Sequence, residues 1–93
     1  MKALGISPLL VEHQTLADAR HTMKIAAQAA SKGNLRLGVS RAITAVIQAS
    51  IVAASTKNKS TKLYADLVIQ DARELIMGIV VEGAKVHRMR KMG

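Results

Sequence analysis

The sequence predicts an all-α fold, a three-helix antiparallel bundle with a long C-terminal helix. Apolar residues recur every seven positions, often with another three residues later, which is the spacing of one helix face. The 49% apolar fraction is almost entirely aliphatic, because Tyr64 is the single aromatic residue. A core without aromatic bulk favours closely packed helices, shared between subunits. We therefore expect helices at about residues 8–31, 35–55 and 61–90, completed by oligomerisation.

These helices are expected to form one domain over residues 1–93, with an N-terminal arm at 1–7 and a basic tail at 85–93. The first helix has a clear start and end. Ser7 is a suitable N-cap and Pro8 fits the first helical position, where a missing N–H costs nothing. Gly33 suits the left-handed position that follows a helix. Between them runs a narrow, alanine-rich stripe of Leu9, Leu16, Ala19, Met23, Ala26 and Ala30.

The segment from Leu35 to Arg41 is ambiguous. Apolar and polar residues alternate there, which is a strand period, but the same residues can form the first turns of the second helix. Ser40 is a plausible N-cap if that helix begins late. A strand followed by two helices resembles the layout of ribbon-helix-helix DNA-binding proteins, whose paired strands enter the major groove. That resemblance implies one base-reading face carrying Lys32, Asn34 and Arg36.

The middle of the chain, Ala42 to Ala54, carries no charge. This run is shorter than the roughly 20 apolar residues that span a bilayer, and we expect no transmembrane segment. It is also too apolar to face water on a small monomer. We therefore expect a second copy of the chain to cover it. The predicted oligomer interface consists of Ile43, Val46, Ile47 and Ile51.

The third helix follows a polar linker at residues 55–60 and is the longest of the three. Its apolar stripe comprises Ala65, Val68, Ala72, Leu75, Ile79, Val86 and Met89. At 1.5 Å per residue it would measure about 45 Å and would extend beyond the first two helices. Gly78 and Gly83 lie in its interior, where glycine is unfavourable. They predict either a close helix contact or a kink.

Charge is the strongest indication of a partner. Fourteen Lys and Arg residues against six Asp and Glu give a net charge of +8, which favours nucleic acid or another acidic partner. Solvated linker lysines and helix-end cations that complement the helix dipole are the competing interpretations. No aromatic residues lie among the cations, so stacking on bases is not expected. The candidate nucleic-acid-binding residues are Lys57, Lys59, Lys62, Lys85, Arg88, Arg90 and Lys91.

Enzyme chemistry has little support in the sequence. There is no cysteine, and His13, Asp18 and His21 on one predicted helix do not complete a metal site. No glycine-rich phosphate loop is present. We therefore expect no catalytic residues, no metal, no cofactor and no small-molecule substrate.

Three functions fit these observations. The first is a non-enzymatic homo-oligomer that contacts the nucleic-acid backbone through basic helix ends. The second is a structural subunit of a filament, virion or secretion machine, packed through its apolar central helix. The third is a small regulator or inhibitor of an acidic partner protein. The N-terminal residues lack the apolar stretch of a signal peptide, so we expect a cytoplasmic location or an assembled particle.

Overall fold

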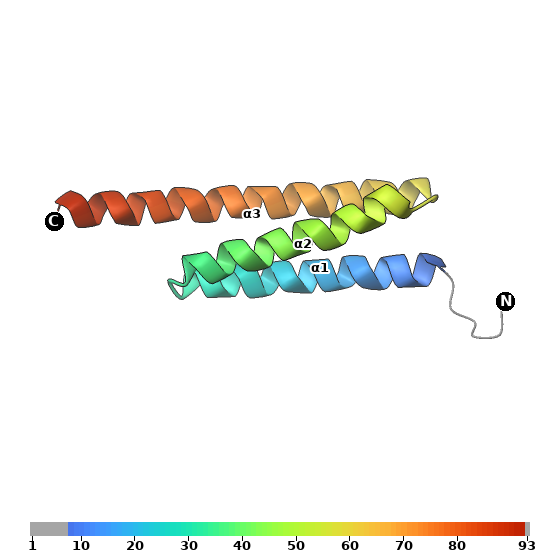
Figure 1. Ribbon diagram of the computed structural model, residues 1–93, viewed down its shortest axis with the longest axis horizontal. Coiled ribbons are helices and arrows are strands. Elements are labelled where there is room, and N and C mark those ends of the chain that lie inside the picture. Colours follow the sequence, from blue (N-terminus) through green and yellow to red (C-terminus); the bar gives the residue numbers. More distant parts are fainter. Residues whose placement is uncertain (1–7, 93) are drawn as a thin grey trace.

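Three helices pack side by side in the computed structural model, which describes the backbone of residues 8–92 and the side chains of residues 10–85. They are α1 (Pro8–Ser31), α2 (Leu35–Ser55) and α3 (Lys59–Met92), and no strand occurs within that range. Successive helices run antiparallel, and α2 lies across α1 and α3 (Figure 1). The predicted all-α bundle is confirmed, and its completion by oligomerisation stays a prediction.

The turn between α1 and α2 is a Schellman motif, which satisfies carbonyl groups left free at a helix end. Gly33 has a positive φ of 89°. The N–H of Gly33 donates to the carbonyl of Ala30 over 3.0 Å, and the N–H of Asn34 donates to that of Ala29 over 2.9 Å. The predicted role of Gly33 is confirmed. The proposed N-cap Ser7 lies outside the described residues.

The segment from Leu35 to Arg41 is helical, so the strand interpretation and the ribbon-helix-helix layout are wrong. Asn34 caps α2, since its side-chain oxygen accepts a hydrogen bond from the backbone N–H of Leu37 over 3.2 Å. Ser40, the alternative cap, lies inside the helix. The alternation in the sequence misled because Gly38, one of its non-apolar positions, is buried, whereas Leu37, one of its apolar positions, is exposed.

The connection between α2 and α3 is shorter than predicted and comprises only residues 56–58. Asn58 is a good N-cap because its side-chain oxygen accepts the backbone N–H of Thr61 over 2.9 Å. This cap starts α3 at Lys59, so Lys59 belongs to the helix rather than to the linker. Thr61 is buried and also lies within 3.4 Å of the His13 ring nitrogen Nε2.

The core is a narrow seam of small side chains contributed by all three helices. Leu16 and Val68 are the largest fully buried side chains, and the rest of the cluster is mainly alanine. Alanine allows helix backbones to approach closely, as the sequence indicated. The core cluster consists of Leu16, Ala19, Ala45, Ala49, Val52, Ala65, Val68 and Ala72.

The three helices also converge at Gly38. A Cβ atom at this position would lie 3.1 Å from the carbonyl oxygen of Ala26 and 3.2 Å from Ile79 Cδ1. Gly83 makes a similar contact, because its Cβ would lie 3.2 Å from Leu35 Cδ1, whereas Gly78 has nothing within 4 Å. The close-contact interpretation therefore fits Gly83. Neither glycine interrupts α3, which is one unbroken helix (Figure 1).

The same substitution at Gly38 and Gly78 is expected to have different effects. Gly78→Ala gains helix propensity and should raise the free energy of unfolding by about 0.5–1 kcal/mol. Gly38→Ala gains the same propensity but must displace the Ala26 backbone, and overpacking costs about 1–3 kcal/mol. Urea unfolding of both variants at one protein concentration checks this. Equal stability of the two variants would show that the contact at Gly38 is not tight.

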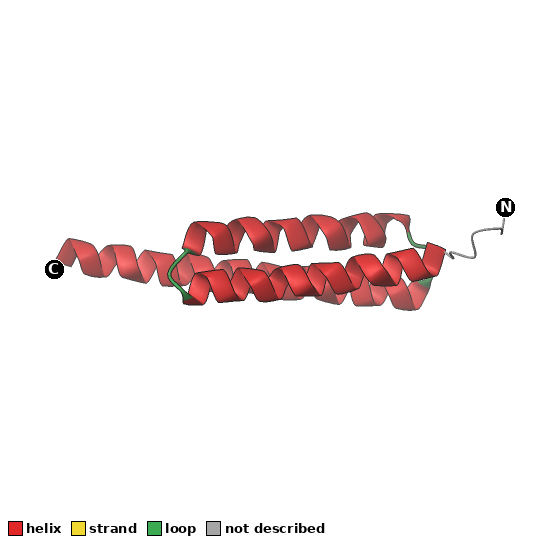
Figure 2. Cartoon of the chain, turned by 90° about the horizontal axis from the view of Figure 1, so that it is seen from below, coloured by secondary structure: helices red, strands yellow, loops and turns green. Residues whose placement is uncertain are grey.

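The C-terminal part of α3 extends past the turn that joins α1 and α2, as predicted (Figures 1 and 2). The molecule is accordingly elongated, with extents of 64 × 22 × 13 Å. Basic residues near the start of α3 and at its far end are thus held apart by a single rigid helix.

Candidate functional site

The outward side of α2 presents an apolar face to solvent. Ile43, Ile47 and Ile51 are spaced by one helical turn and are 46%, 55% and 62% exposed. The sequence-predicted interface therefore includes three side chains that this chain leaves uncovered. Val46, the fourth predicted member, is half-buried and packs against the core of its own chain.

The uncharged run Ala42 to Ala54 lies within α2, which is longer than the run. Leu35–Ser55 has the length and composition to cross a bilayer, a test that core helices of soluble proteins also pass. Arg36 and Arg41 both lie within this helix and are exposed.

The predicted basic residues lie toward opposite ends of the molecule. Lys57, Lys59 and Lys62 are exposed around the α2–α3 turn, and Lys85 is exposed near the end where α3 leaves the bundle. At 1.5 Å per residue, Lys62 and Lys85 are about 35 Å apart along α3. Arg88, Arg90 and Lys91 belong to the last turns of α3, but their side chains lie outside the described range.

Among the described side chains, none of these predicted cations forms an ion pair. Among the described side chains there is one ion pair, between Arg20 and Asp71 at 4.0 Å. Lys57, Lys59, Lys62 and Lys85 therefore have no carboxylate partner among those side chains. Much of the excess positive charge remains available to an anionic partner.

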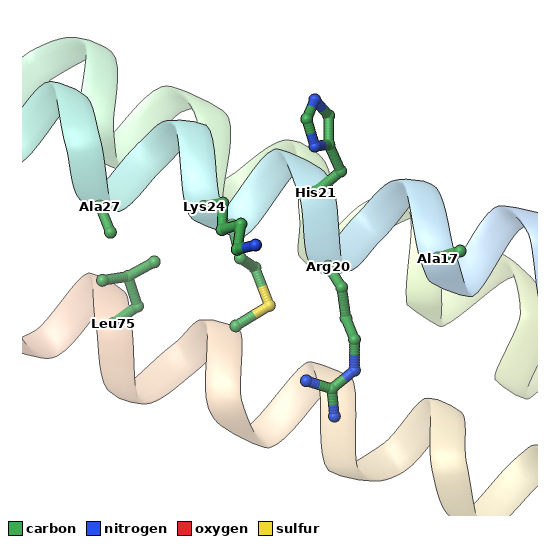
Figure 3. Close-up of a pocket in the computed structure, with 7 residues that line it drawn as sticks. Ala17, Arg20, His21, Lys24, Ala27 and Leu75 are labelled. Atoms are coloured by element: carbon green, nitrogen blue, oxygen red, sulfur yellow. The ribbon is translucent and has the colours of Figure 1, made fainter.

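A groove between α1 and α3 is a feature that the sequence did not reveal. The groove has a volume of about 650 Å³ and is lined by both cationic and apolar side chains (Figure 3). In this view Arg20 reaches toward α3, whereas His21 points away from it. The lining residues are Ala17, Arg20, His21, Met23, Lys24, Ala27 and Leu75.

Arg20 bridges this groove from α1 to α3. Its Nε donates a hydrogen bond to the Tyr64 hydroxyl over 2.8 Å, and its guanidinium carbon lies 5.3 Å from the centroid of the Tyr64 ring. This arrangement is a cation–π contact reinforced by a hydrogen bond. Because the partners are 44 residues apart, no local spacing could have indicated the contact. The only indication in the sequence was that Tyr64 is the single aromatic residue.

The described histidines and carboxylates lie apart from one another. Within the described part of the chain, no three His, Cys, Asp or Glu side chains lie close enough together to hold a metal ion. Asp18 accepts a hydrogen bond from Gln14 over 3.0 Å. His13 faces Thr61, and His21 lies on the groove edge.

Comparisons with known proteins found no matching family model, no matching curated protein and no matching solved structure.

Proposed function

We propose that this protein is a non-catalytic, homo-oligomeric helical protein that binds the phosphate backbone of nucleic acids through its basic ends. The observation that carries the proposal is the set of exposed lysines around the α2–α3 turn, which have no carboxylate partner among the described side chains. Each such cation that meets a phosphate releases a condensed counterion and so adds affinity.

The two basic groups are far apart on the molecule. Lys62 and Lys85 are about 35 Å apart along α3. At about 100° per residue, their separation in sequence also places them about 140° apart around the helix axis. The lysines at the α2–α3 turn and the basic end of α3 would therefore contact separate stretches of nucleic-acid backbone. The basic tail, which includes Arg88, Arg90 and Lys91, would add contacts at the second of these stretches.

Binding is expected to be independent of base sequence. Tyr64 is the one aromatic side chain of the protein, and its hydroxyl and ring are both engaged by Arg20. No exposed aromatic remains for stacking on a base, and phosphate contacts carry no base information.

Self-association through Ile43, Ile47 and Ile51 would strengthen a weak backbone contact. Covering these side chains removes apolar area from water. The resulting oligomer carries several copies of each lysine cluster on one particle. Linked weak sites bind with an avidity well above that of a single site.

The test is a variant in which Lys57, Lys59 and Lys62 are all replaced by Gln. Losing three phosphate contacts should flatten the plot of log affinity against log salt by about 2.7, at roughly 0.9 per contact. Affinity for random-sequence duplex is measured by fluorescence anisotropy across a salt series. Asn58 is retained because it caps α3.

A matched control removes the same charge elsewhere, by replacing Lys24, Lys32 and Arg36 with Gln. All three are exposed and lie away from the α2–α3 turn. For this control variant, the slope of log affinity against log salt should differ from the wild-type slope by less than about 1. If both variants keep the wild-type mass and melting temperature and have the same slope as the wild type, the lysine cluster does not bind nucleic acid.

A second candidate function is a structural subunit of a larger assembly. It is favoured by a second exposed apolar surface on α3, at Met77, Val80 and Val81. An assembly subunit would form large particles without nucleic acid, whereas a small binder would form a closed oligomer. Light scattering of the protein alone separates the two.

A further inference from the structure

The second half of α3 has an apolar side that its own chain does not cover. Met77, Val80 and Val81 are 65%, 54% and 50% exposed. The opposite side of the same stretch packs on the bundle, because Ile79 is buried and approaches Gly38. Gly78 has open space around it, so a neighbouring helix could approach closely here.

Opposite charges border this surface, which we call the α3 patch (Glu74, Met77, Val80, Val81 and Lys85). Glu74 lies one turn before Met77, and Lys85 lies one turn after Val81, on the same side of the helix. Both charged side chains are exposed, and neither forms an ion pair with a described side chain. They are separated by about 16 Å along the axis.

We propose that the α3 patch binds the α3 patch of a second copy, with the two helices antiparallel. When the two-fold axis passes halfway between Glu74 and Lys85, each Glu74 is level with the partner's Lys85. The same axis places Met77 near the partner's Val81, so apolar side chains fill the centre between two ion pairs. An isologous contact of this kind needs a self-complementary surface, which the charge order along α3 provides.

Other arrangements are disfavoured by charge. A parallel pair would place Glu74 against Glu74 and Lys85 against Lys85. An antiparallel pair centred on Glu74 would bring two carboxylates together. Like charges directly opposite each other are destabilising. The charge pattern therefore selects both the direction and the register of the contact.

This contact is separate from the α2 face and does not involve the lysines at the α2–α3 turn. It does engage Lys85, so Arg88, Arg90 and Lys91 would be the cations left for phosphate at that end of α3. One consequence does rest on the proposed function, since it requires the α2 contact as well. A subunit with two different self-complementary surfaces binds two different neighbours. Such subunits close into a particle of dihedral symmetry when the two two-fold axes intersect, and otherwise form an open chain.

A charge-swap experiment on the full-length chain tests the α3 contact. It is performed in an Ile47→Asp background, which removes the α2 contact. Glu74→Lys or Lys85→Glu alone should each weaken dimerisation on the order of tenfold, because two ion pairs become repulsive contacts. The double variant Glu74→Lys/Lys85→Glu should restore dimerisation, since both pairs are re-formed with their charges exchanged. Masses are measured by sedimentation equilibrium over a concentration series.

Mixing the two single variants provides an independent readout. All charge pairs are complementary in the mixed dimer, so a one-to-one heterodimer should form at concentrations where each variant alone is monomeric. Substitution of exposed side chains should leave the helical circular dichroism unchanged. A folded Ile47→Asp protein that stays monomeric at all concentrations would overturn the α3 contact, whatever the nucleic-acid affinity. Weakening by both single changes without recovery in the double variant or in the mixture would also overturn it.

Discussion

Replacing Ile47 with Asp is expected to convert the protein from an oligomer into a species whose α2 face no longer associates. Ile47 is the central side chain of that face and is 55% exposed within one chain. Loss of the Ile47 side chain from the contact should reduce the free energy of association by about 1.5–3 kcal/mol per subunit. Burying the introduced carboxylate would add a further cost. For two subunits this is a loss of roughly 10²- to 10⁴-fold in association. Light scattering coupled to size-exclusion chromatography measures the change.

The fold should survive this substitution, because the introduced carboxylate would face water in the separated chain. Ile47→Val is the conservative control and should retain association. Gln28→Asp introduces the same charge on the exposed side of α1 and should leave the mass unchanged. A wild-type protein that is already monomeric, with Ile47→Asp indistinguishable from it, would contradict the assignment of the α2 face.

Leu16→Ala is expected to produce the largest loss of stability. Leu16 has no exposed surface and is one of the two largest fully buried side chains. Leu-to-Ala changes in a core cost about 2–5 kcal/mol, through lost burial and the cavity that remains. The total free energy of unfolding of a small domain is only about 5–15 kcal/mol. At about 4–8 °C per kcal/mol, the melting temperature should fall by at least roughly 8 °C.

Leu63→Ala is the matched control for this prediction. It is the same chemical change on α3, where Leu63 is 65% exposed, and surface substitutions usually change stability by less than about 0.5 kcal/mol. Both variants are compared by urea unfolding at the same low protein concentration. An equal decrease in the free energy of unfolding for both variants would mean that the core is not the alanine-lined seam around Leu16.

Most of the fold could be predicted because local signals agreed with one another. Gly33 ends α1 as its sequence context indicated, and the heptad stripes around Leu16 and Val68 form the core. The start of α2 was ambiguous, because an alternating pattern at residues 35–39 is compatible with both a strand and a helix. The deciding factor was tertiary: buried Gly38 packs against Ala26, Ala30 and Ile79.

The candidate surfaces could be predicted only in part. The uncharged run identified the isoleucine face, but only the packing of α2 shows that Val46 belongs to the core while Ile47 does not. The Arg20–Tyr64 contact and the α1–α3 groove depend on how two distant helices meet, which no local pattern encodes. The α3 patch could not be identified because Met77, Val80 and Val81 flank Ile79 in sequence, and only the packing of α3 shows that they are exposed while Ile79 is buried.

If two copies meet through the α2 face, a single cysteine introduced at its centre should cross-link them. The chain has no cysteine, so Ile47→Cys gives one thiol per subunit at the centre of the face. A two-fold contact centred there brings the two thiols within disulfide range, which requires Cα atoms about 4.4–6.8 Å apart. Gln28→Cys, on an exposed side of α1, is the reference. Under mild oxidation at micromolar concentration, Ile47→Cys should give a rapid, nearly complete covalent dimer, whereas Gln28→Cys should give little. Equal and slow cross-linking of both variants would rule out a two-fold contact centred on Ile47.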